Sequence, residues 1–288
     1  MKLCVDLGAT NVKSALIENY NIVRHAVTPT DTKNGRAGVV NSLARAIDGL
    51  MCESVTQICI SSAGRIDSAT GKVIYATDNL PGYTGFDITA WVRENYNLPC
   101  VALNDGFAAL LGELALEPEY SAKRVVMLTL GSGVGGAYAV NGELVANERN
   151  GFALFGHIVL HENGAPCNCG KAGCAEQYLS GRAINRTAQK YGIGQDAIFC
   201  EYRSGNPNAR EIVRLIRQDL KKLLARIQKV SPFDICLLGG GAVDGMGESF
   251  SSVTGGLGYD IRRAKAGNDA GLFGAFYFSE TDTMKMRQ

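Results

Sequence analysis

Two stretches of this chain follow one pattern: a short apolar strand, then Leu-Gly and a small residue, then a second apolar strand. The first is Val5-Asp-Leu-Gly-Ala-Thr10. The second, Leu128-Thr-Leu-Gly-Ser-Gly133, lies 123 positions later in a chain of 288 residues. A long-period internal repeat predicts two related lobes. Two unrelated glycine hairpins would give the same letters, so this alternative stays open here.

The order of the predicted elements indicates a mixed α/β protein. Residues 2–30 alternate short apolar runs with turn residues, which predicts an antiparallel meander. Apolar residues at three-to-four spacing predict helices at 39–51 and 212–230, and a further helical stretch surrounds Trp91. Short apolar runs predict strands at 58–60, 101–103, 124–130, 137–140 and 235–238. This alternation and the chain length predict an α/β fold with about two domains.

Charge and composition exclude several classes of protein. The formal net charge is +1, so the basic face of helix 212–230 is expected to be solvated and not to bind nucleic acid. The longest uncharged run, 125–140, is too short and too rich in glycine to span a membrane. Asp6 would interrupt the apolar core of a secretion signal, so none is expected. Nine cysteines, an odd number, favour reduced thiols or a metal site in the cytoplasm over disulfides.

Three glycine-rich turns each follow a predicted strand, at Gly8, at Gly131–Gly136 and at Gly239–Gly241. Successive backbone N–H groups in such turns can cradle an anion. None has the Gly-Lys-Ser/Thr of a P-loop, and a strand instead of a helix follows Gly131–Gly136, which excludes a dinucleotide-binding turn. We expect two hairpins to hold the phosphates of a nucleotide and the third turn to meet the nucleoside. Asp6 would then bind Mg²⁺ directly or through water.

A cysteine cluster predicts a zinc site. Cys167, Cys169 and Cys174 fall within eight residues, and His157 precedes Cys167 by ten. Three cysteines and a histidine form a common tetrahedral zinc set, and four protein ligands indicate a structural role. His161 could replace His157 as the fourth ligand, and three unliganded thiols in a loop remain an alternative.

Asp105 follows the strand 101–103, at the end where open α/β sheets bind their ligands. A carboxylate there can act as a general base toward a hydroxyl group. The alternative is a helix N-cap, because an apolar helical segment follows.

Together these motifs resemble the ROK family (repressor, open reading frame, kinase) of the actin-like and hexokinase-like ATPase superfamily, over nearly the whole chain. The segments 6–11 and 130–136 resemble its two phosphate motifs, and Asn104-Asp105 its catalytic pair. Gly156-His157 with the cysteine cluster and Glu176 resembles its zinc signature, and 239–241 with 269–275 completes the match.

The resemblance implies two actin-like (ribonuclease H-like) lobes with a cleft between them, at residues 1–115 and 116–275, with a C-terminal helix at 276–288 completing the first lobe. It implies transfer of the γ-phosphoryl group of ATP to a sugar hydroxyl, with Asp105 as the base, Mg²⁺ on the phosphates and a structural zinc. The implied sugar-binding residues are Gly64, Asn79, Asn104, Asp105, His157 and Glu176. The implied nucleotide-binding residues are Asp6, Gly8, Thr10, Asn11, Gly131, Ser132, Gly133, Gly239, Gly240 and Gly241.

Three positions depart from the family pattern. Leu154 stands where a sugar-binding carboxylate is usual, Phe107 where asparagine is frequent, and Ala63 where proline is common. Because a site loses selectivity when it loses a hydroxyl acceptor, Leu154 indicates either a substrate with an acylated group, such as N-acetylmannosamine, or weak activity. The alternative function is therefore a sugar-binding regulator. The zinc signature disfavours an ATPase of the actin or heat-shock type.

The family is commonly dimeric, so a homodimer is expected. Its repressors carry a winged helix ahead of the first phosphate motif. Here that motif begins almost at Met1, so no DNA-binding domain is expected.

Overall fold

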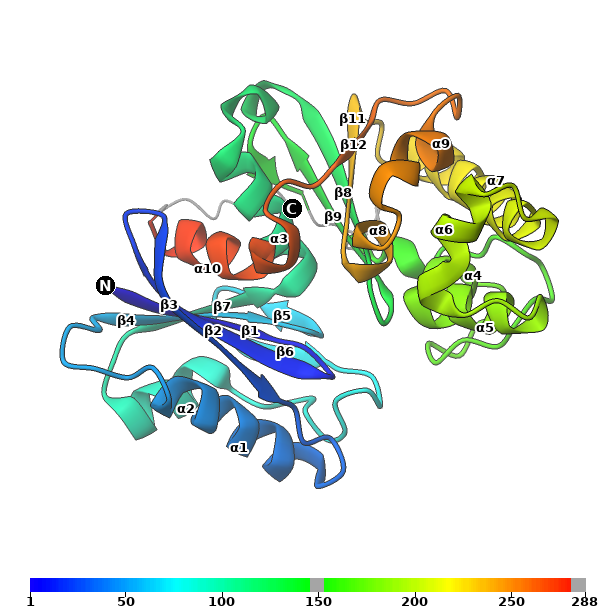
Figure 1. The fold of residues 1–288 in the computed structure, drawn as a ribbon. Coiled ribbons are helices and arrows are strands. Elements are labelled where there is room, and N and C mark those ends of the chain that lie inside the picture. Colours follow the sequence, from blue (N-terminus) through cyan, green and yellow to red (C-terminus); the bar gives the residue numbers. More distant parts are fainter. Residues whose placement is uncertain (146–152, 281–288) are drawn as a thin grey trace. The chain divides into compact units, whose positions relative to one another are not determined.

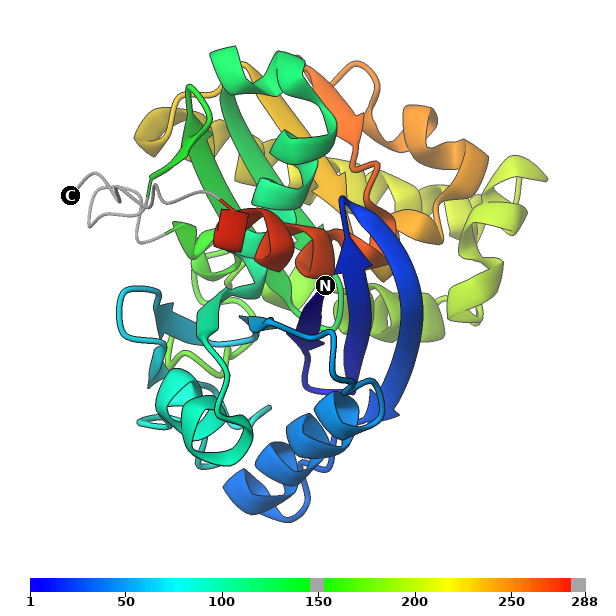
Figure 2. The same cartoon turned by 90° about the vertical axis from the view of Figure 1, so that its left-hand side faces the viewer.

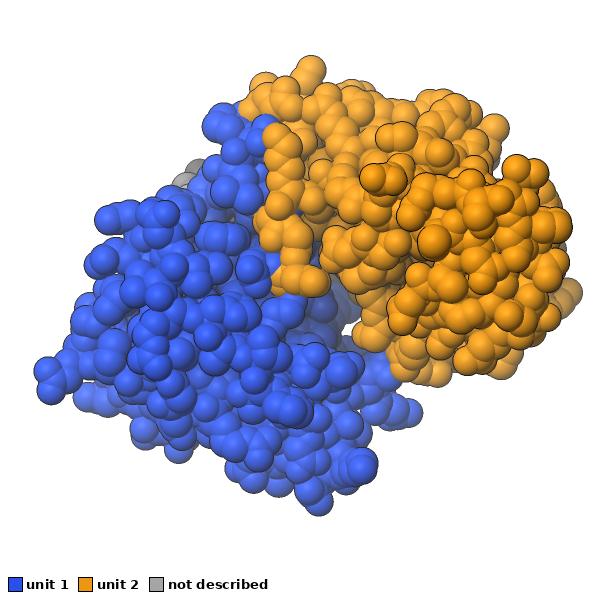
Figure 3. Space-filling view, in the orientation of Figure 1, with its two compact units in different colours: residues 1–118, 269–284 blue, residues 119–268, 285–288 orange. Residues whose placement is uncertain are grey.

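The computed structural model describes residues 1–145 and 153–280, and these fall into two compact units (Figure 3). Unit 1 consists of Met1–Pro118 and the segment that begins at Asp269. Unit 2 consists of Glu119–Asn268. The predicted boundary at 275 differs from this division, because it falls inside helix α10 (Ala270–Glu280), which packs wholly on unit 1. This helix begins before the predicted 276, and residues 281–288 lie outside the described chain.

The sheet of unit 1 brings the ends of three parallel strands to one edge. Its strand order is β3-β2-β1-β4-β7, in which β1, β4 and β7 are parallel and β2 and β3 complete an antiparallel meander. Leu7 pairs with Ser62, and Ser62 pairs with Asn104. Residues at the carboxyl ends of β1 and β7 are therefore only one strand apart. The strands are β1 (Lys2–Leu7), β2 (Asn11–Glu18), β3 (Asn21–Pro29), β4 (Gln57–Ser62) and β7 (Cys100–Asn104).

Helices cover both faces of this sheet. Helices α1 (Gly35–Asp48) and α2 (Ile88–Tyr96) lie on one face, and α3 (Asp105–Leu116) and α10 lie on the other (Figures 1 and 2). The strands between them are mostly apolar inside, as Leu3, Val5 and Ile60 show with no exposed surface, although Ser14, Ser61 and Ser62 are also fully buried. A separate hairpin of β5 (Arg65–Asp67) and β6 (Lys72–Tyr75) leaves the end of β4.

Glycines let α3 and α10 approach each other at backbone distance. A β-carbon at Gly274 would lie 1.6 Å from the carbonyl oxygen of Ala108, and one at Gly112 would lie 2.6 Å from that of Ala270. No side chain fits at either position. This crossing fixes the first turn of α10 beside the carboxyl edge of the sheet.

Unit 2 repeats the sheet topology of unit 1. Its strand order is β10-β9-β8-β11-β12, with β8, β9 and β10 antiparallel and β8, β11 and β12 parallel. Each strand thus has a counterpart at the same place in the sheet of unit 1, which confirms the predicted two-lobed repeat. The strands are β8 (Arg124–Leu130), β9 (Val134–Val140), β10 (Glu143–Leu144), β11 (Ile235–Gly239) and β12 (Ile261–Arg263).

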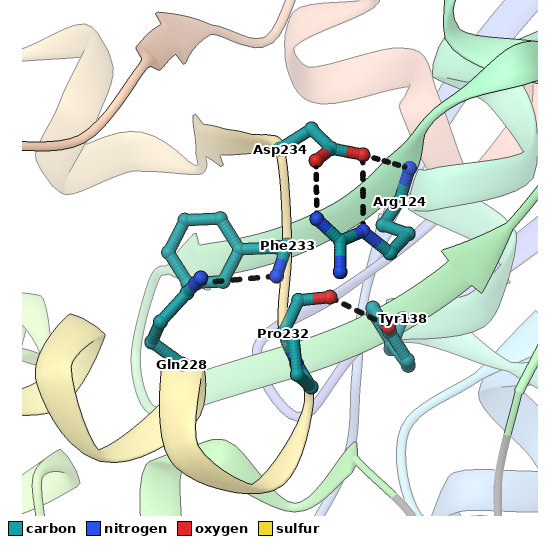
Figure 4. Close-up of polar contacts among 6 residues, drawn as sticks. All are labelled: Arg124, Tyr138, Gln228, Pro232, Phe233 and Asp234. Atoms are coloured by element: carbon teal, nitrogen blue, oxygen red, sulfur yellow. Dashed lines mark hydrogen bonds and ion pairs between the residues drawn. The ribbon is translucent and has the colours of Figure 1, made fainter.

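Polar contacts fix the start of β11 against β8 (Figure 4). The Arg124 guanidinium donates to both carboxylate oxygens of Asp234, at 2.5 and 3.1 Å. The Arg124 backbone N–H donates to the same carboxylate at 2.9 Å, and the Asp234 N–H donates to the Arg124 carbonyl at 2.9 Å. Arg124 holds the pKa of Asp234 down at about 2. The Tyr138 hydroxyl donates to the carbonyl of Pro232 at 2.7 Å, which ties β9 to the same turn. The register of the parallel strands is thereby set at their first residues.

The long helix α7 (Pro207–Val230) organises the helical part of unit 2. It begins five residues before the predicted start, because the Asn206 side chain caps it and Pro207 suits a first helical position. The predicted apolar face is buried. Helices α4, α5, α6 and α9 pack against α7 (Figure 1). These and the shorter elements are η1 (Pro118–Ala122), η3 (Phe155–His157), α4 (Glu176–Leu179), α5 (Gly181–Lys190), η4 (Gln195–Ala197), α6 (Ile198–Arg203), α8 (Gly241–Asp244), η5 (Gly247–Ser249), α9 (Phe250–Thr254) and η6 (Gly267–Asp269). Among the described residues, no helix combines the length and the apolarity needed to cross a membrane.

Replacing Gly274 by alanine should destabilise unit 1 by about 3 kcal/mol, because the added methyl overlaps the backbone of α3 and overpacking costs about 1–3 kcal/mol. In an ordinary helix the same change increases the free energy of unfolding by about 1 kcal/mol. The sign of the change in this free energy therefore shows whether the two helices cross closely. Urea unfolding followed by circular dichroism measures the effect. The matched control is Gly194→Ala, where a β-carbon meets no atom within 4 Å and φ is −69°. A G274A midpoint at or above that of the control would contradict the close helix crossing.

Candidate active site

The carboxyl edge of the unit 1 sheet carries an aspartate near the end of β1. The Asp6 carboxylate accepts a hydrogen bond from the Ser61 hydroxyl of β4 at 2.7 Å, and Lys13 Nζ lies 3.7 Å from its other oxygen. The first turn of α10 approaches it from another side, since a β-carbon at Gly271 would lie 2.7 Å from the carboxylate. Asp6 is thus fixed by a hydroxyl, an ammonium group and the positive end of a helix.

Sequence reasoning named Asp6 but not these neighbours. Ser61 reaches it through the parallel pairing of β1 with β4, which pairs Asp6 directly with Ser61. Gly271 reaches it through the fold of α10 onto the sheet. The signal for this contact in the sequence is Gly271, one of two glycines in the segment 269–275, but the glycine alone does not show what it contacts.

Asn104 and Asp105 divide two tasks at the end of β7. The Asn104 side chain caps α3 by accepting hydrogen bonds from the N–H groups of Gly106 and Phe107, at 2.9 and 3.2 Å. The N-cap is therefore Asn104, and the alternative that Asp105 has this role is wrong. Asp105 accepts from the Asn104 amide and from the Gly106 N–H, both at 2.8 Å and both on Oδ1. Its Oδ2 makes no hydrogen bond to the described residues.

The Asn104 amide also joins the predicted sugar-binding loop to this edge, because it donates to the Gly64 carbonyl at 2.7 Å. Gly64 has a φ of +107°, where a side chain is strained, and a β-carbon there would lie 3.0 Å from the Tyr75 carbonyl. The structure therefore brings Gly64, Asn104 and Asp105 together. Asn79 lies half-buried in the turn after β6, and its side chain makes no hydrogen bond within residues 1–145 and 153–280.

Burial and a second carboxylate raise the pKa of Asp105 to about 7. Burial is the larger cause, and the negative charge of Asp6 adds to it, while the hydrogen bonds from Gly106 and Asn104 oppose both. Burial also raises the pKa of Asp6, against the effects of Lys13 and Ser61. A carboxyl group that titrates near neutrality is suited to take up a proton, and a neighbouring carboxylate is a ligand for a hard divalent cation.

The turn between β1 and β2 adjoins this edge. It is closed by the Gly8 N–H, which donates to the Asn11 carbonyl at 3.0 Å, and by Thr30, whose hydroxyl donates to the Gly8 carbonyl at 2.7 Å. Thr10 and Asn11 are exposed at its tip. The predicted phosphate residues of unit 1 thus form an ordered, exposed turn beside Asp6, although the Gly8 N–H is already used within the turn.

The corresponding turn of unit 2, between β8 and β9, is held by Glu176. Its carboxylate accepts from the Val134 N–H at 3.1 Å, and a β-carbon at Gly133 would lie 2.5 Å from the same oxygen. Gly181 donates to the Gly131 carbonyl, and Arg182 to the Ser132 carbonyl, both at 2.7 Å. Glu176, predicted to bind sugar, therefore contacts the turn predicted to bind phosphate, a connection that the sequence spacing did not reveal.

The third glycine turn adjoins a small cavity in unit 2. Gly240 has a φ of +91° and lies against the backbone of Leu130, so only glycine fits there. Gly241 follows as a wall of a cavity of about 200 Å³. The other walls mix apolar and polar groups, a combination suited to a planar base, and they are Ile184, Gln195, Asp196, Ile198, Phe199, Ala242 and Gly245.

The predicted zinc ligands converge in unit 2. The ligand atoms of His157, Cys167, Cys169 and Cys174 all lie within 4.8 Å of one another. Cys167 Sγ is 3.6 Å from His157 Nδ1, and the sulfurs of Cys169 and Cys174 are 3.6 Å apart. Zinc with Zn–S bonds of about 2.3 Å would place tetrahedral sulfurs about 3.7 Å apart, so the donor set fits this ion. His161 is not part of the cluster, because its Nε2 contacts Asp219 at 2.7 Å.

The three departures from the family pattern have different surroundings. Phe107 is only 6% exposed and packs in the core on α3, so it is a structural residue. Ala63 is half-buried and packs against the core of unit 1. Leu154, in contrast, is 49% exposed at the entry to η3, which carries His157. Of the three side chains, Leu154 is thus the most open to solvent.

Comparison with known proteins identifies the family. The ROK family profile matches residues 2–282. The chain belongs to the ROK family. It is 28% identical over 289 residues to an N-acetylmannosamine kinase of Haemophilus influenzae (strain PittEE), with 96% of this chain and 94% of that protein aligned. It is 29% identical over 293 residues to an N-acetylmannosamine kinase of Salmonella arizonae, with 98% and 99% aligned.

A solved ROK structure has the same fold. The ROK family glucokinase of Streptomyces griseus, in complex with glucose and AMPPNP, superposes with a TM-score of 0.79 at 26% identity, over 95% of this chain and 97% of that one. This agreement and the repeated sheet topology confirm the predicted actin-like α/β fold class.

Purified protein should contain about one zinc ion per chain, since four converging ligands make a closed structural site. Cys169→Ser and His157→Gln should each lose the metal. Cys200→Ser and His161→Gln are the matched controls, because Cys200 is exposed on α6 and His161 contacts Asp219. Inductively coupled plasma mass spectrometry measures the zinc content of each variant. Equal zinc in C169S and C200S would contradict the assigned ligand set.

Proposed function

We propose that this chain is an ATP-dependent sugar kinase that transfers the γ-phosphoryl group of ATP to a hydroxyl of N-acetylmannosamine, with Asp105 as the general base. Asp105 supports this proposal by its position at the sheet edge, where burial and Asp6 raise its pKa to about 7. A chain of this family that aligns end to end with N-acetylmannosamine kinases has at its sheet edge a carboxyl group suited to this reaction.

Asp105 would accept the proton of the sugar hydroxyl while the hydroxyl oxygen forms a bond to the γ-phosphorus. The bond between that phosphorus and the bridging oxygen of ADP breaks in the same displacement. The free Oδ2 supports this role, because Oδ1 already holds the carboxyl group through Asn104 and Gly106. Positioning and electrostatics supply most of the rate increase in such a transfer.

Asp6 would hold Mg²⁺ on the phosphates, directly or through water. The donor set fits, because carboxylate oxygen is the ligand that Mg²⁺ prefers, and the Ser61 hydroxyl and Lys13 oppose the rise in the pKa of Asp6 that burial causes. When bound, Mg²⁺ neutralises charge that develops on the transferred group. The turn with Thr10 and Asn11, the turn 131–133 and the cavity beside Gly239–Gly241 would hold the phosphates and the base.

Zinc would shape the loop that carries His157. With Nδ1 facing the cysteine sulfurs, its Nε2 is left to meet a sugar hydroxyl. Gly64, Asn79, Asn104 and Glu176 complete the proposed sugar-binding set. Glu176 would act while also holding the phosphate turn through Val134.

Leu154 supports an acylated substrate. It presents an exposed apolar side chain three residues before His157, where the family pattern has a carboxylate. A leucine cannot accept a hydrogen bond from a hydroxyl group, but it can pack against the methyl of an N-acetyl group. This favours an N-acylhexosamine over glucose.

The proposal also covers the cellular location and the oligomeric state of the protein. Nine cysteines without a disulfide among the described residues are consistent with a reducing cytoplasm. A net charge of +1 offers no field for nucleic acid. We propose a cytoplasmic homodimer that acts on a small-molecule sugar. The alternative of a catalytically inactive regulator is not favoured, since Asp6 and Asp105 are both retained and Phe107 lies in the core.

Release of ADP from Mg-ATP should occur with N-acetylmannosamine and should be much slower with mannose and glucose. Asp105→Asn should lower kcat by about 10²–10⁴, because it removes the proton acceptor while keeping the hydrogen bonds on Oδ1. Asp48→Asn, an exposed acid on α1, is the matched control and should retain full activity. Turnover unchanged in D105N would exclude Asp105 as the base. Absence of turnover with every sugar would overturn the kinase assignment.

A further inference from the structure

Unit 2 contains a hollow of about 530 Å³ whose walls carry four arginines. This volume is within the range of small-ligand sites, about 300–1,000 Å³. Arg203 comes from the end of α6, and Arg210, Arg214 and Arg217 follow one another along α7. No carboxylate lines the hollow, and the remaining lining residues are Tyr202, Val213 and Ser252.

The arginines on α7 are placed unfavourably for an isolated helix. Arg210 and Arg214 are four residues apart, and Arg214 and Arg217 are three apart, so their charges are neighbours on one helix face. Like charges at these spacings destabilise a helix. Two of the four charges have an acidic partner: Glu211 forms a bidentate pair with Arg214 at 2.7 Å, and Glu248 lies 3.9 Å from Arg203. The hollow therefore retains net positive charge.

Arg217 and Arg210 differ in whether their guanidinium groups are already hydrogen-bonded within the protein. Arg217 is fixed by three carbonyl oxygens at the end of α9, those of Ser252, Val253 and Gly255. Its guanidinium is thus held in place before any ligand arrives. The Arg210 guanidinium makes no hydrogen bond or ion pair to the described residues, so its donors are free.

We propose that this hollow binds a phosphate-bearing small molecule with at least two negative charges. The planar fork of a guanidinium matches phosphate oxygens in bidentate fashion, and an anion between α6 and α7 would relieve the repulsion among the arginines. The Tyr202 and Ser252 hydroxyls add neutral donors at the walls. The site is independent of the proposed kinase reaction, because none of its residues belongs to the set proposed for that reaction.

Isothermal titration calorimetry of the full-length protein with pyrophosphate and with glucose 6-phosphate tests the proposal. Arg203→Gln/Arg210→Gln should weaken binding by about tenfold or more, since it removes two charged donors. The matched control, Lys221→Gln/Lys229→Gln, removes two exposed charges of α7 outside the hollow and should bind within about twofold of the natural protein. Arg210→Lys keeps the charge but loses the planar guanidinium that binds phosphate in bidentate fashion. The affinity of this variant for the two compounds should lie between those of the two double variants.

Tighter binding of pyrophosphate would identify a polyphosphate ligand, and tighter binding of glucose 6-phosphate a sugar phosphate. Either result supports the site when the binding is weakened in R203Q/R210Q and kept in K221Q/K229Q. No binding of either compound, or equal weakening in the two double variants, would overturn it. Circular dichroism of each variant checks that α7 is intact.

Discussion

Two carboxylates held at one edge of a sheet are the constraint on which the rest of unit 1 depends. Asp6 lies on β1 and Asp105 directly follows β7, and only β4 separates these two strands. Each carboxyl group is largely withdrawn from water, so both cannot ionise without cost. The neighbouring groups affect the pKa values of the two acids differently. Burial raises the pKa of Asp6 against the opposing effects of Lys13 and Ser61, while burial and the charge of Asp6 raise that of Asp105 to about 7. One acid is thereby suited to a cation and the other to a proton.

Residues outside this edge help to position Asp6 and Asp105. The glycines of α3 and α10 allow a backbone crossing that places the first turn of α10 against Asp6. Asn104 caps α3 and holds both Asp105 and the Gly64 carbonyl, so one side chain couples a helix, an acid and a loop. In unit 2 the same strand topology supports a different chemistry, a sulfur-rich cluster beside a turn held by Glu176.

Motifs formed by neighbouring residues in the chain could be predicted from the sequence. Contacts between residues that are distant in the sequence could not. The repeat of strand and glycine turn predicted two lobes, and the spacing of Cys167, Cys169 and Cys174 predicted a metal cluster. The choice between His157 and His161 needed the structure, because it depends on Asp219 of a distant helix. The hydrogen bond of Ser61 to Asp6 follows from strand register, and the burial of Phe107 follows from the packing of α3; neither leaves a local pattern in the sequence.

The proposed role of Asp105 depends on a near-neutral pKa of its carboxyl group. A ¹³C nuclear magnetic resonance titration of the aspartate carboxyl carbons, with the Asp105 signal assigned by its loss in D105N, measures this directly in the protein without ligands. We expect a midpoint near pH 7, because burial and the charge of Asp6 disfavour the ionised form. A midpoint near 4, the ordinary value for aspartate, would contradict it.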